Sequence, residues 1–321
     1  MSEIEYRALE AAARDALLAP SVFNTQPWQW RISGNALELR ADWSRRLTAT
    51  DPDGHSLVLS CGAALHHARI SLLAAGWKVS VDRVHGEALA RICLLEPGPV
   101  DPVAVVLREA IHRRRTDRRP FADDPVPVEA LNALGEAAAA EGVRLHRVGM
   151  DQMPMLAIAA SLAGAEESSN PGYRLELMRW TNRPEWSEDG VPPSTAVRKV
   201  PRRVPVREFA MSPQEGIPVE PGGDRGAAYL ILYGDAVDTA DWLRAGEALS
   251  AVLLTAVSCG LAVAPLTDVL EVEHPRELVQ GLLREGGMPY ALVRCGYPVD
   301  PTPLATAPRR SAGDVIRPAS E

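Results

Sequence analysis

An internal repeat constrains the fold of this 321-residue chain more strongly than any other feature of its sequence. Residues 62–65 (GAAL) align with residues 246–249 (GEAL), and a further glycine, Gly76 or Gly260, stands fourteen positions beyond the first glycine of each. Each later glycine can end a helix in the left-handed C-cap conformation, and a strand pattern follows it. A helix-then-strand order recurs at residues 128–148. We therefore predict two copies of one α+β module fused head to tail; the alternative is two unrelated Ala- and Leu-rich helices that align by composition alone.

Composition and charge narrow the class of protein. With 46% apolar residues the chain can bury a substantial core, and its net charge of -8 argues against a general nucleic-acid or anionic-membrane surface. The four cysteines include no CxxC pair, which favours reduced thiols over a disulfide framework or a zinc site. The first residues do not form a signal peptide, and no apolar run approaches the roughly 20 residues of a membrane span. We expect a soluble, cytoplasmic protein without nucleic-acid or membrane partners.

The remaining pattern predicts alternating helices and short strands. Helices are expected at residues 3–19, 57–75, 103–113, 128–141, 150–164, 238–259 and 275–283, and strands at residues 28–32, 36–40, 77–81, 89–95, 143–148, 227–233, 261–266 and 290–295. Residues 96–102 have the composition of a linker, which divides the chain into parts 1–100 and 101–321. From about residue 165 to residue 226 the chain is rich in proline, and we expect an irregular insertion there.

The loop after the first helix carries polar groups that could bind a ligand. Residues 20–28 (PSVFNTQPW) lie between that helix and the first strand, and Pro20 has no N–H with which to continue the helix. The candidate binding residues of this loop are Pro20, Ser21, Asn24 and Gln26. The simpler interpretation is a turn made of the usual turn residues. Against it stands the order helix, PSxxNxQPW, strand, which resembles the cofactor loop of the FMN-dependent nitroreductases.

A second segment strengthens this resemblance. Residues 114–118 (RRTDR) resemble the RRSxR signature that opens an ordinary nitroreductase subunit. FMN has a phosphate, which suits the bidentate geometry of arginine, and ribityl hydroxyls, which suit a threonine. The resemblance assigns Arg114 and Thr116 to the phosphate and ribityl chain, with Arg115 in the same site, and Arg118 to the flavin ring, where a positive charge would stabilise the reduced form. A solvated basic helix end is the alternative.

Two further segments resemble parts of the same cofactor site. Residues 260–266 (GLAVAPL) resemble the segment whose backbone amides lie beside the flavin N5 and O4 atoms, and the closing stretch of the chain resembles one in which a basic residue reaches the phosphate. The residues that these segments add to the site are Ala264, Pro265, Leu266, Arg309 and Arg310. For the two arginines, a solvated tail is the alternative.

The two main elements are divided between the halves in a complementary way. In ordinary nitroreductases each FMN takes the RRSxR element from one subunit of a homodimer and the PSxxN loop from the other. Here the N-terminal half keeps the loop but has only residues 1–6 where an arginine signature would stand, whereas Glu141-Gly142 replaces the loop in the C-terminal half. The resemblance implies an α+β, nitroreductase-like fold with two fused copies in an intrachain pseudo-dimer, one FMN per chain and a monomer. Among fused nitroreductases, the chain looks most like the twin-domain Acg-type proteins of mycobacteria.

Two functions are compatible with these features. In the first, the protein is an oxidoreductase that passes hydride from NAD(P)H to FMN and then to a nitro compound or a quinone, with no catalytic side chain required for the first step. In the second, it sequesters or stores FMN under a closed lid. The insertion is either that lid, with Trp180 or Trp186 over the flavin, or an arm that wraps the other half. A metal site is not expected, since the adjacent His66 and His67 point to different helix faces.

Overall fold

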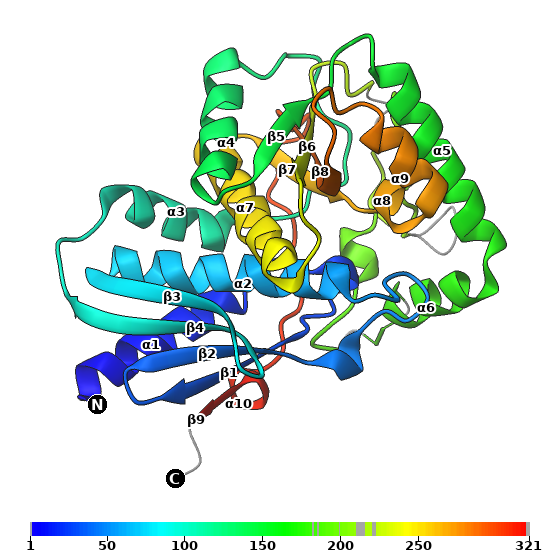
Figure 1. The fold of residues 1–321 in the computed structure, drawn as a ribbon. Coiled ribbons are helices and arrows are strands. Elements are labelled where there is room, and N and C mark those ends of the chain that lie inside the picture. The colour runs from blue at the N-terminus through cyan, green and yellow to red at the C-terminus, as the bar shows by residue number, and fades with distance from the viewer. Residues whose placement is uncertain are drawn as a thin grey trace.

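The structure is a computed structural model, and it describes residues 2–181, 183–184, 186–198, 200–209, 216–219 and 223–318. Two β-sheets lie at opposite ends of the molecule, and two long helices, α2 (His55–Ala74) and α7 (Thr239–Ser258), cross between them (Figure 1). The predicted α+β class is therefore confirmed. The insertion predicted at about residues 165–226 includes residues 182, 185, 199, 210–215 and 220–222, which lie outside the described part of the chain.

The elements of the first part of the chain begin and end close to where the sequence predicts them. They are, in order, α1 (Glu3–Ala16), η1 (Val22–Asn24), β1 (Trp28–Ser33), β2 (Ala36–Ala41), η2 (Trp43–Arg45), α2, β3 (Trp77–His85), β4 (Ala88–Pro97) and α3 (Pro102–Arg113). A capping box of Ser2 and Glu5 begins α1, and Asp101 caps α3 through the backbone N–H groups of Val103 and Ala104.

The second part contains elements that the sequence analysis missed. Its elements are α4 (Val128–Ala140), β5 (Arg144–Arg147), α5 (Met153–Ser169), α6 (Pro171–Thr181), η3 (Pro193–Thr195), β6 (Ala228–Gly234), α7, β7 (Ala262–Leu266), α8 (Asp268–Glu271), α9 (Glu273–Gln280), β8 (Met288–Gly296), α10 (Ala312–Val315) and β9 (Ile316–Pro318). The prediction of an irregular chain after residue 165 was wrong for α5 and α6. Those helices pack on partners distant in sequence, which periodicity cannot reveal.

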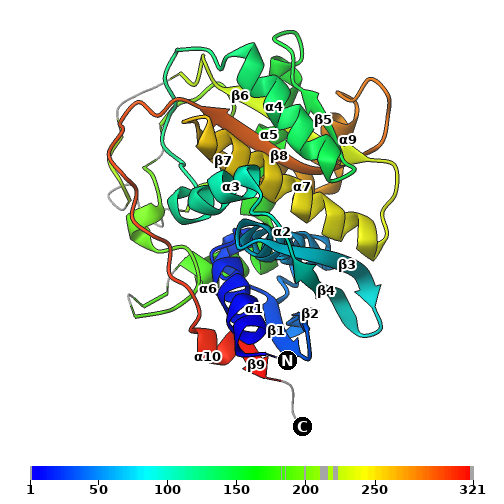
Figure 2. The ribbon, with the colours of Figure 1, turned by 90° about the vertical axis from the view of Figure 1, so that its left-hand side faces the viewer.

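The two sheets share one strand order. In the first sheet the order is β3-β4-β2-β1-β9, and in the second it is β7-β8-β6-β5 read from the other edge. Apart from β9, each strand of the first sheet has a counterpart at the same place in the second. The strand β9 pairs in parallel with β1, and the segment that leads to it runs down one side of the molecule from the second sheet to the first (Figure 2). The predicted boundary at residue 100 therefore separates β9 from the sheet that it extends.

Helices α2 and α7 pack against each other through a pair of glycines. A Cβ atom added to Gly62 would lie 2.0 Å from the backbone oxygen of Leu243, and one added to Gly246 would lie 1.9 Å from that of Leu59. Close beside this contact, His66 Nδ1 and Ser250 Oγ lie 2.8 Å apart and are separated by 184 positions, the same separation as Gly62 and Gly246. The contact is thus reciprocal, as a two-fold relation between the helices requires.

The burial of α2 corrects one expectation. By length and composition, α2 is the one described helix that could cross a membrane, although no such run was expected. However, 83% of the qualifying window is buried inside the protein, and its apolar side chains belong to a core that continues through α7 and both sheets. An apolar surface all round a helix is typical of a helix buried on every side.

Buried histidines of α2 predict how stability depends on pH. His67 is fully buried, and burial, with the nearby charge of Arg114, lowers its pKa to about 3. A histidine that cannot accept a proton in the folded state stabilises the fold above its ordinary pKa of 6.5 and loses that effect as pH falls toward 3. We expect the free energy of unfolding of the wild type to fall between pH 7 and pH 5 more steeply than that of His67→Asn, by up to about 1.4 kcal/mol per pH unit, and the melting temperature to fall with it. Parallel melting curves for the two proteins would contradict this assignment.

Candidate functional site

The loop after α1 has an unusual backbone. Phe23, Asn24 and Gln26 have positive φ angles of 50°, 55° and 49°, a region that residues other than glycine rarely occupy. The hydroxyl oxygen of Ser21 accepts a hydrogen bond from the backbone N–H of Gln26 at 2.9 Å and so closes the loop on itself. Such conformations cost of order 1–3 kcal/mol each and cluster at functional sites. The loop is therefore a candidate site on its backbone geometry alone.

The arginine-rich segment lies against β7 of the second half. Helix α3 ends at Arg113, and the chain continues extended, so that Thr116 forms a bridge with Val263 and the Asp117 N–H donates to the Val263 carbonyl at 2.8 Å. Ala264, Pro265 and Leu266 follow Val263 in strand β7. Two of the predicted binding segments, far apart in the sequence, are thus adjacent.

Two pockets meet where these elements converge. The first is mostly apolar, and its predicted site residues are Pro20, Ser21, Thr116, Arg118, Ala264, Pro265 and Leu266. The second contains a cluster of arginines, and its predicted site residues are Pro20, Ser21, Asn24, Arg114, Arg115, Thr116, Arg118 and Arg309. The pockets share Pro20, Ser21, Thr116 and Arg118, so they form one continuous site between the two halves.

The cationic pocket lacks an acidic residue among the described residues that line it. Arg114 is 4% exposed, and its Nε and Nη1 atoms are buried without a hydrogen-bond partner, as are the Nε atoms of Arg115 and Arg309. Burial and the charges of Arg309 and Arg115 lower the pKa of Arg114 to about 9, and burial with the charge of Arg115 lowers the pKa of Arg309 to about 10. Clustered guanidinium groups with unpaired N–H donors favour the binding of an anion such as a phosphate or a carboxylate.

Asn24 holds Arg309 in this pocket. Asn24 Nδ2 donates to the carbonyl oxygens of Gly190 and Pro308, both at 3.0 Å, and Asn24 Oδ1 accepts from Arg309 Nη1 at 3.1 Å. Arg309 Nη2 also donates to the Leu18 carbonyl at 3.1 Å. The polar atoms of Asn24 are therefore occupied by protein partners, and its side chain positions Arg309.

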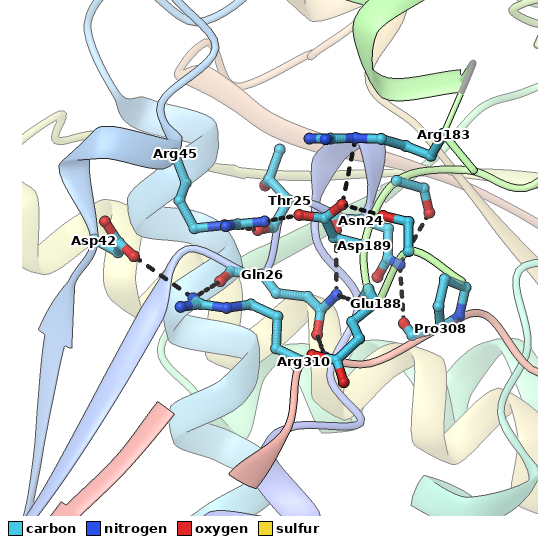
Figure 3. A network of polar contacts seen from close by, with 12 residues as sticks. Asn24, Thr25, Gln26, Asp42, Arg45, Arg183, Glu188, Asp189, Pro308 and Arg310 are labelled. Atoms are coloured by element: carbon cyan, nitrogen blue, oxygen red, sulfur yellow. Dashed lines mark hydrogen bonds and ion pairs between the residues drawn. The ribbon is translucent and has the colours of Figure 1, made fainter. Parts of the chain in front are cut away.

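Gln26 and Arg310 lie outside the described lining of both pockets. The fully buried Gln26 amide donates to the Glu188 carbonyl at 2.8 Å and accepts from the Arg310 backbone N–H at 2.9 Å (Figure 3). Beside this contact, Arg45 forms an ion pair with Asp189 (Figure 3). The two predicted site residues thus join the loop, the tail and the insertion, and the structure gives them a positioning role.

The insertion lines both pockets. Val206, Arg207 and Phe209 contribute to the apolar pocket, and residues 190–192 contribute to the cationic one. Neither Trp180 nor Trp186 is among the described residues that line these pockets. Trp180 is buried in a cluster with Phe23, Leu47 and Tyr173, and Trp186 is 83% exposed. An aromatic residue of the insertion that does line the apolar pocket is Phe209, and the guanidinium carbon of Arg118 lies over its ring, 4.4 Å from the ring centroid.

Charged residues beneath the apolar pocket were not identified from the sequence. Arg294 is fully buried and lines the pocket, where it pairs with Asp224 at 2.7 Å and donates to the carbonyls of Asp117 and Arg119. Asp224 in turn accepts from the Phe121 N–H at 2.6 Å. Arg294 therefore fixes the backbone that follows the arginine signature. A charged residue inside the apolar pattern of a strand was the available signal.

The assembled site suits a ligand with a planar apolar body and an anionic end. The apolar pocket can hold the body, the arginines can bind the anion, and hydroxyls of Ser21 and Thr116 lie where the two parts meet. In the described part of the chain, His, Cys, Asp and Glu residues form no group of three that could hold a metal ion.

Comparison with known proteins finds relatives in Mycobacterium tuberculosis strain ATCC 25618 / H37Rv, although no family model matches the sequence. The protein named "Putative NAD(P)H nitroreductase Rv3131" is 38% identical over 316 residues, which cover 94% of this chain and 88% of that protein. "Putative NAD(P)H nitroreductase acg" is 35% identical over 315 residues, which cover 96% of this chain and 95% of that protein. A solved nitroreductase with bound FMN from Bacteroides fragilis is similar to 64% of this chain and 95% of its own, with 16% identity and a TM-score of 0.40.

Proposed function

Since this chain belongs to the nitroreductase family that includes the mycobacterial Acg protein, we propose that it binds FMN and reduces nitro compounds or quinones with electrons from NAD(P)H. The observation that carries the proposal is an arginine cluster, without an acidic side chain among the described residues of its pocket, that adjoins an apolar pocket. A phosphate would supply the missing partner for the buried guanidinium nitrogens, and the isoalloxazine ring would fill the apolar pocket. The residues present therefore fit FMN.

Each part of the site has a role in this proposal. Arg114, Arg115 and Arg309 would hold the phosphate, and Thr116 with Ser21 would bind the ribityl chain. Arg118 and the backbone of residues 264–266 would lie along the ring. FMN supplies the capacity to accept and return a hydride, and the protein contributes orientation and electrostatics. A fixed positive charge at Arg118 would stabilise the anionic reduced ring, because a preorganised charge need not reorient during the reaction.

The division of the site supports a fused pseudo-dimer. Residues 1–100 would supply the strained loop, and residues 101–321 would supply the arginine signature and the β7 segment, so that one FMN binds per chain. The equal strand orders and the reciprocal contact of Gly62 with Gly246 support a common ancestry of the halves. A monomer in the cytoplasm, where FMN and NAD(P)H are both present, is the form that we propose.

A second function is favoured by the position of the insertion. Residues 190–192 line the cationic pocket, and Val206, Arg207 and Phe209 line the apolar one, so the insertion would cover a bound FMN. A closed cover suits storage or sequestration of FMN better than turnover. In that case NAD(P)H could not reach the ring. Both functions therefore require bound FMN, and they differ in whether NAD(P)H can reach the flavin ring.

An anaerobic visible spectrum tests the proposal. The purified protein should show a bound-flavin band after incubation with FMN and desalting, and NADH or NADPH should bleach it as dithionite does. A band that dithionite alone bleaches would favour sequestration. A colourless protein after incubation with FMN would overturn both functions.

A further inference from the structure

A cluster of buried acids lies beside the apolar pocket, which Asp268 and Arg207 help to line. Glu167 on α5 and Asp268 and Glu271 on α8 surround the single guanidinium of Arg207. Arg207 pairs with Glu167 at 3.0 Å and also with Glu271. The side chains of these four residues are all less than one-tenth exposed. Three carboxyl groups therefore share one fixed positive charge in a place that water reaches poorly.

The described ion pairs of Glu167 and Glu271 involve one cation, Arg207, while Arg118, Arg174, Arg198 and Arg202 line the groove beside the cluster. Tyr173 on α6 lies beside it, with its ring 5.5 Å from the Arg207 guanidinium, and Arg118 faces Arg207 from the arginine signature but lies over Phe209. Arg207 Nε and Glu271 Oε1 are buried without a hydrogen-bond partner. Three carboxyl groups with one paired cation carry an excess of negative charge, and protonation of one carboxyl would relieve it.

The titration behaviour agrees with this geometry. Burial raises the pKa of Glu271 to about 7, with the charge of Glu167 adding to the effect and Arg207 opposing it. Burial also raises the pKa values of Asp268 and Glu167. Because the three groups interact, the retained proton belongs to the cluster as a whole.

Asp268 connects the cluster to the pocket. Among the described residues that line the apolar pocket, Asp268 is the one carboxylic acid, and His, Cys, Tyr and Lys do not occur there. A groove between α5, α6 and the insertion adjoins the apolar pocket and shares Arg207 and Asp268 with it. Glu167 also lines this groove, so the cluster faces a space through which a proton can be replaced. The acids therefore stand between that groove and the place where an acceptor would lie.

We propose that the cluster is a proton store and that Asp268 is the catalytic residue that delivers its proton to the reduced acceptor. This inference rests on the proposed function. Reduction of a quinone to a hydroquinone takes two electrons and two protons, and a hydride from the reduced flavin brings both electrons but only one proton. Asp268 gives the second proton to the hydroquinone oxygen, its O–H bond breaks as the new O–H bond forms, and the carboxylate regains a proton from Glu271 or from the groove.

The proton store can be tested without any turnover. The apoprotein at pH 7 should show the infrared absorption of a protonated carboxylic acid, and Glu271→Gln should remove or weaken that absorption. The matched control is Glu273→Gln, an exposed acid on α9 just beyond Glu271, which should leave the absorption unchanged. Equal absorption in the wild type and in Glu271→Gln would overturn the store.

Delivery of the proton is tested with chemically reduced protein. Asp268→Asn should retain FMN like the wild type but should slow the oxidation of dithionite-reduced protein by a quinone by about 100-fold and change its solvent deuterium isotope effect. Asp268→Glu should restore part of the rate, which a purely structural role would not predict. An unchanged rate in an Asp268→Asn protein that holds FMN would overturn the delivery step while leaving the proposed function intact. Failure of the wild type to bind FMN would instead overturn the proposed function, and the infrared test would still decide on the store.

Discussion

Replacing Arg114 with methionine should abolish FMN retention and, at the same time, raise the thermal stability of the apoprotein. Arg114 is 4% exposed, two of its guanidinium nitrogens have no hydrogen-bond partner, and Arg115 and Arg309 carry like charges nearby. Loss of one buried partner of a phosphate costs about 2–5 kcal/mol of binding free energy, or roughly a 30-fold or greater rise in Kd. Replacement of a buried, poorly paired charge by an apolar side chain stabilises a fold by about 1–4 kcal/mol.

The two effects have opposite signs, which separates this prediction from simple damage to the fold. FMN affinity is measured by the quenching of flavin fluorescence, and stability by thermal unfolding without FMN. Arg113→Met is the matched control because Arg113 is the exposed neighbour at the end of α3, and neither quantity should change. If Arg114→Met bound FMN as the wild type does, the phosphate assignment would be wrong.

Gly62→Ala and Gly246→Ala should each prevent stable folding. The added methyl group would lie 2.0 Å or 1.9 Å from a backbone oxygen of the opposite helix, and a backbone atom cannot move aside without displacing α2 from α7. Overpacking typically costs about 1–3 kcal/mol and costs more where the contacted atom belongs to a backbone that cannot move, against the roughly 5–15 kcal/mol that stabilises a typical domain. Soluble yield and the midpoint of urea unfolding measure the effect.

Two other helical glycines provide controls for this pair. Gly135 on α4 and Gly164 on α5 have no atom within 4 Å of the position that a Cβ would take. Alanine at either position should raise stability by about 0.5–1 kcal/mol, because glycine in a helix interior costs conformational entropy. Equal behaviour of all four alanine variants would show that the contact between α2 and α7 is not as close as described.

The repeat allowed much of the fold to be predicted from the sequence. The apolar spacing of α2 and α7 and the glycines that end them are local signals, and Gly76 and Gly260 both have the positive φ, 78°, that ends such helices. The antiparallel pairs β1–β2 and β3–β4 likewise follow from alternating patterns and short connections. Each of these features depends on residues close together in the chain.

What could not be predicted depends on contacts between distant segments. The roles of Asn24 and Gln26 depend on carbonyl groups of residues 188–190 and on the tail, which no local pattern connects with the loop. The acid cluster around Arg207 likewise brings together α5, α8 and the insertion. The motif singles out the loop, but only the tertiary structure distinguishes a side chain that lines a pocket from one that holds its neighbour.

The closing tail has a consequence for the lifetime of the protein. Arg309 lies in a segment anchored to one sheet through β8 and to the other through β9, and Arg114 follows the linker between the halves. An anion bound by both arginines would therefore connect the two sheets. At a free concentration 1,000 times its Kd, it would add about 4 kcal/mol to the free energy of unfolding. Because proteases act on transiently opened chains, we expect the abundance of this protein in a cell to follow the supply of FMN.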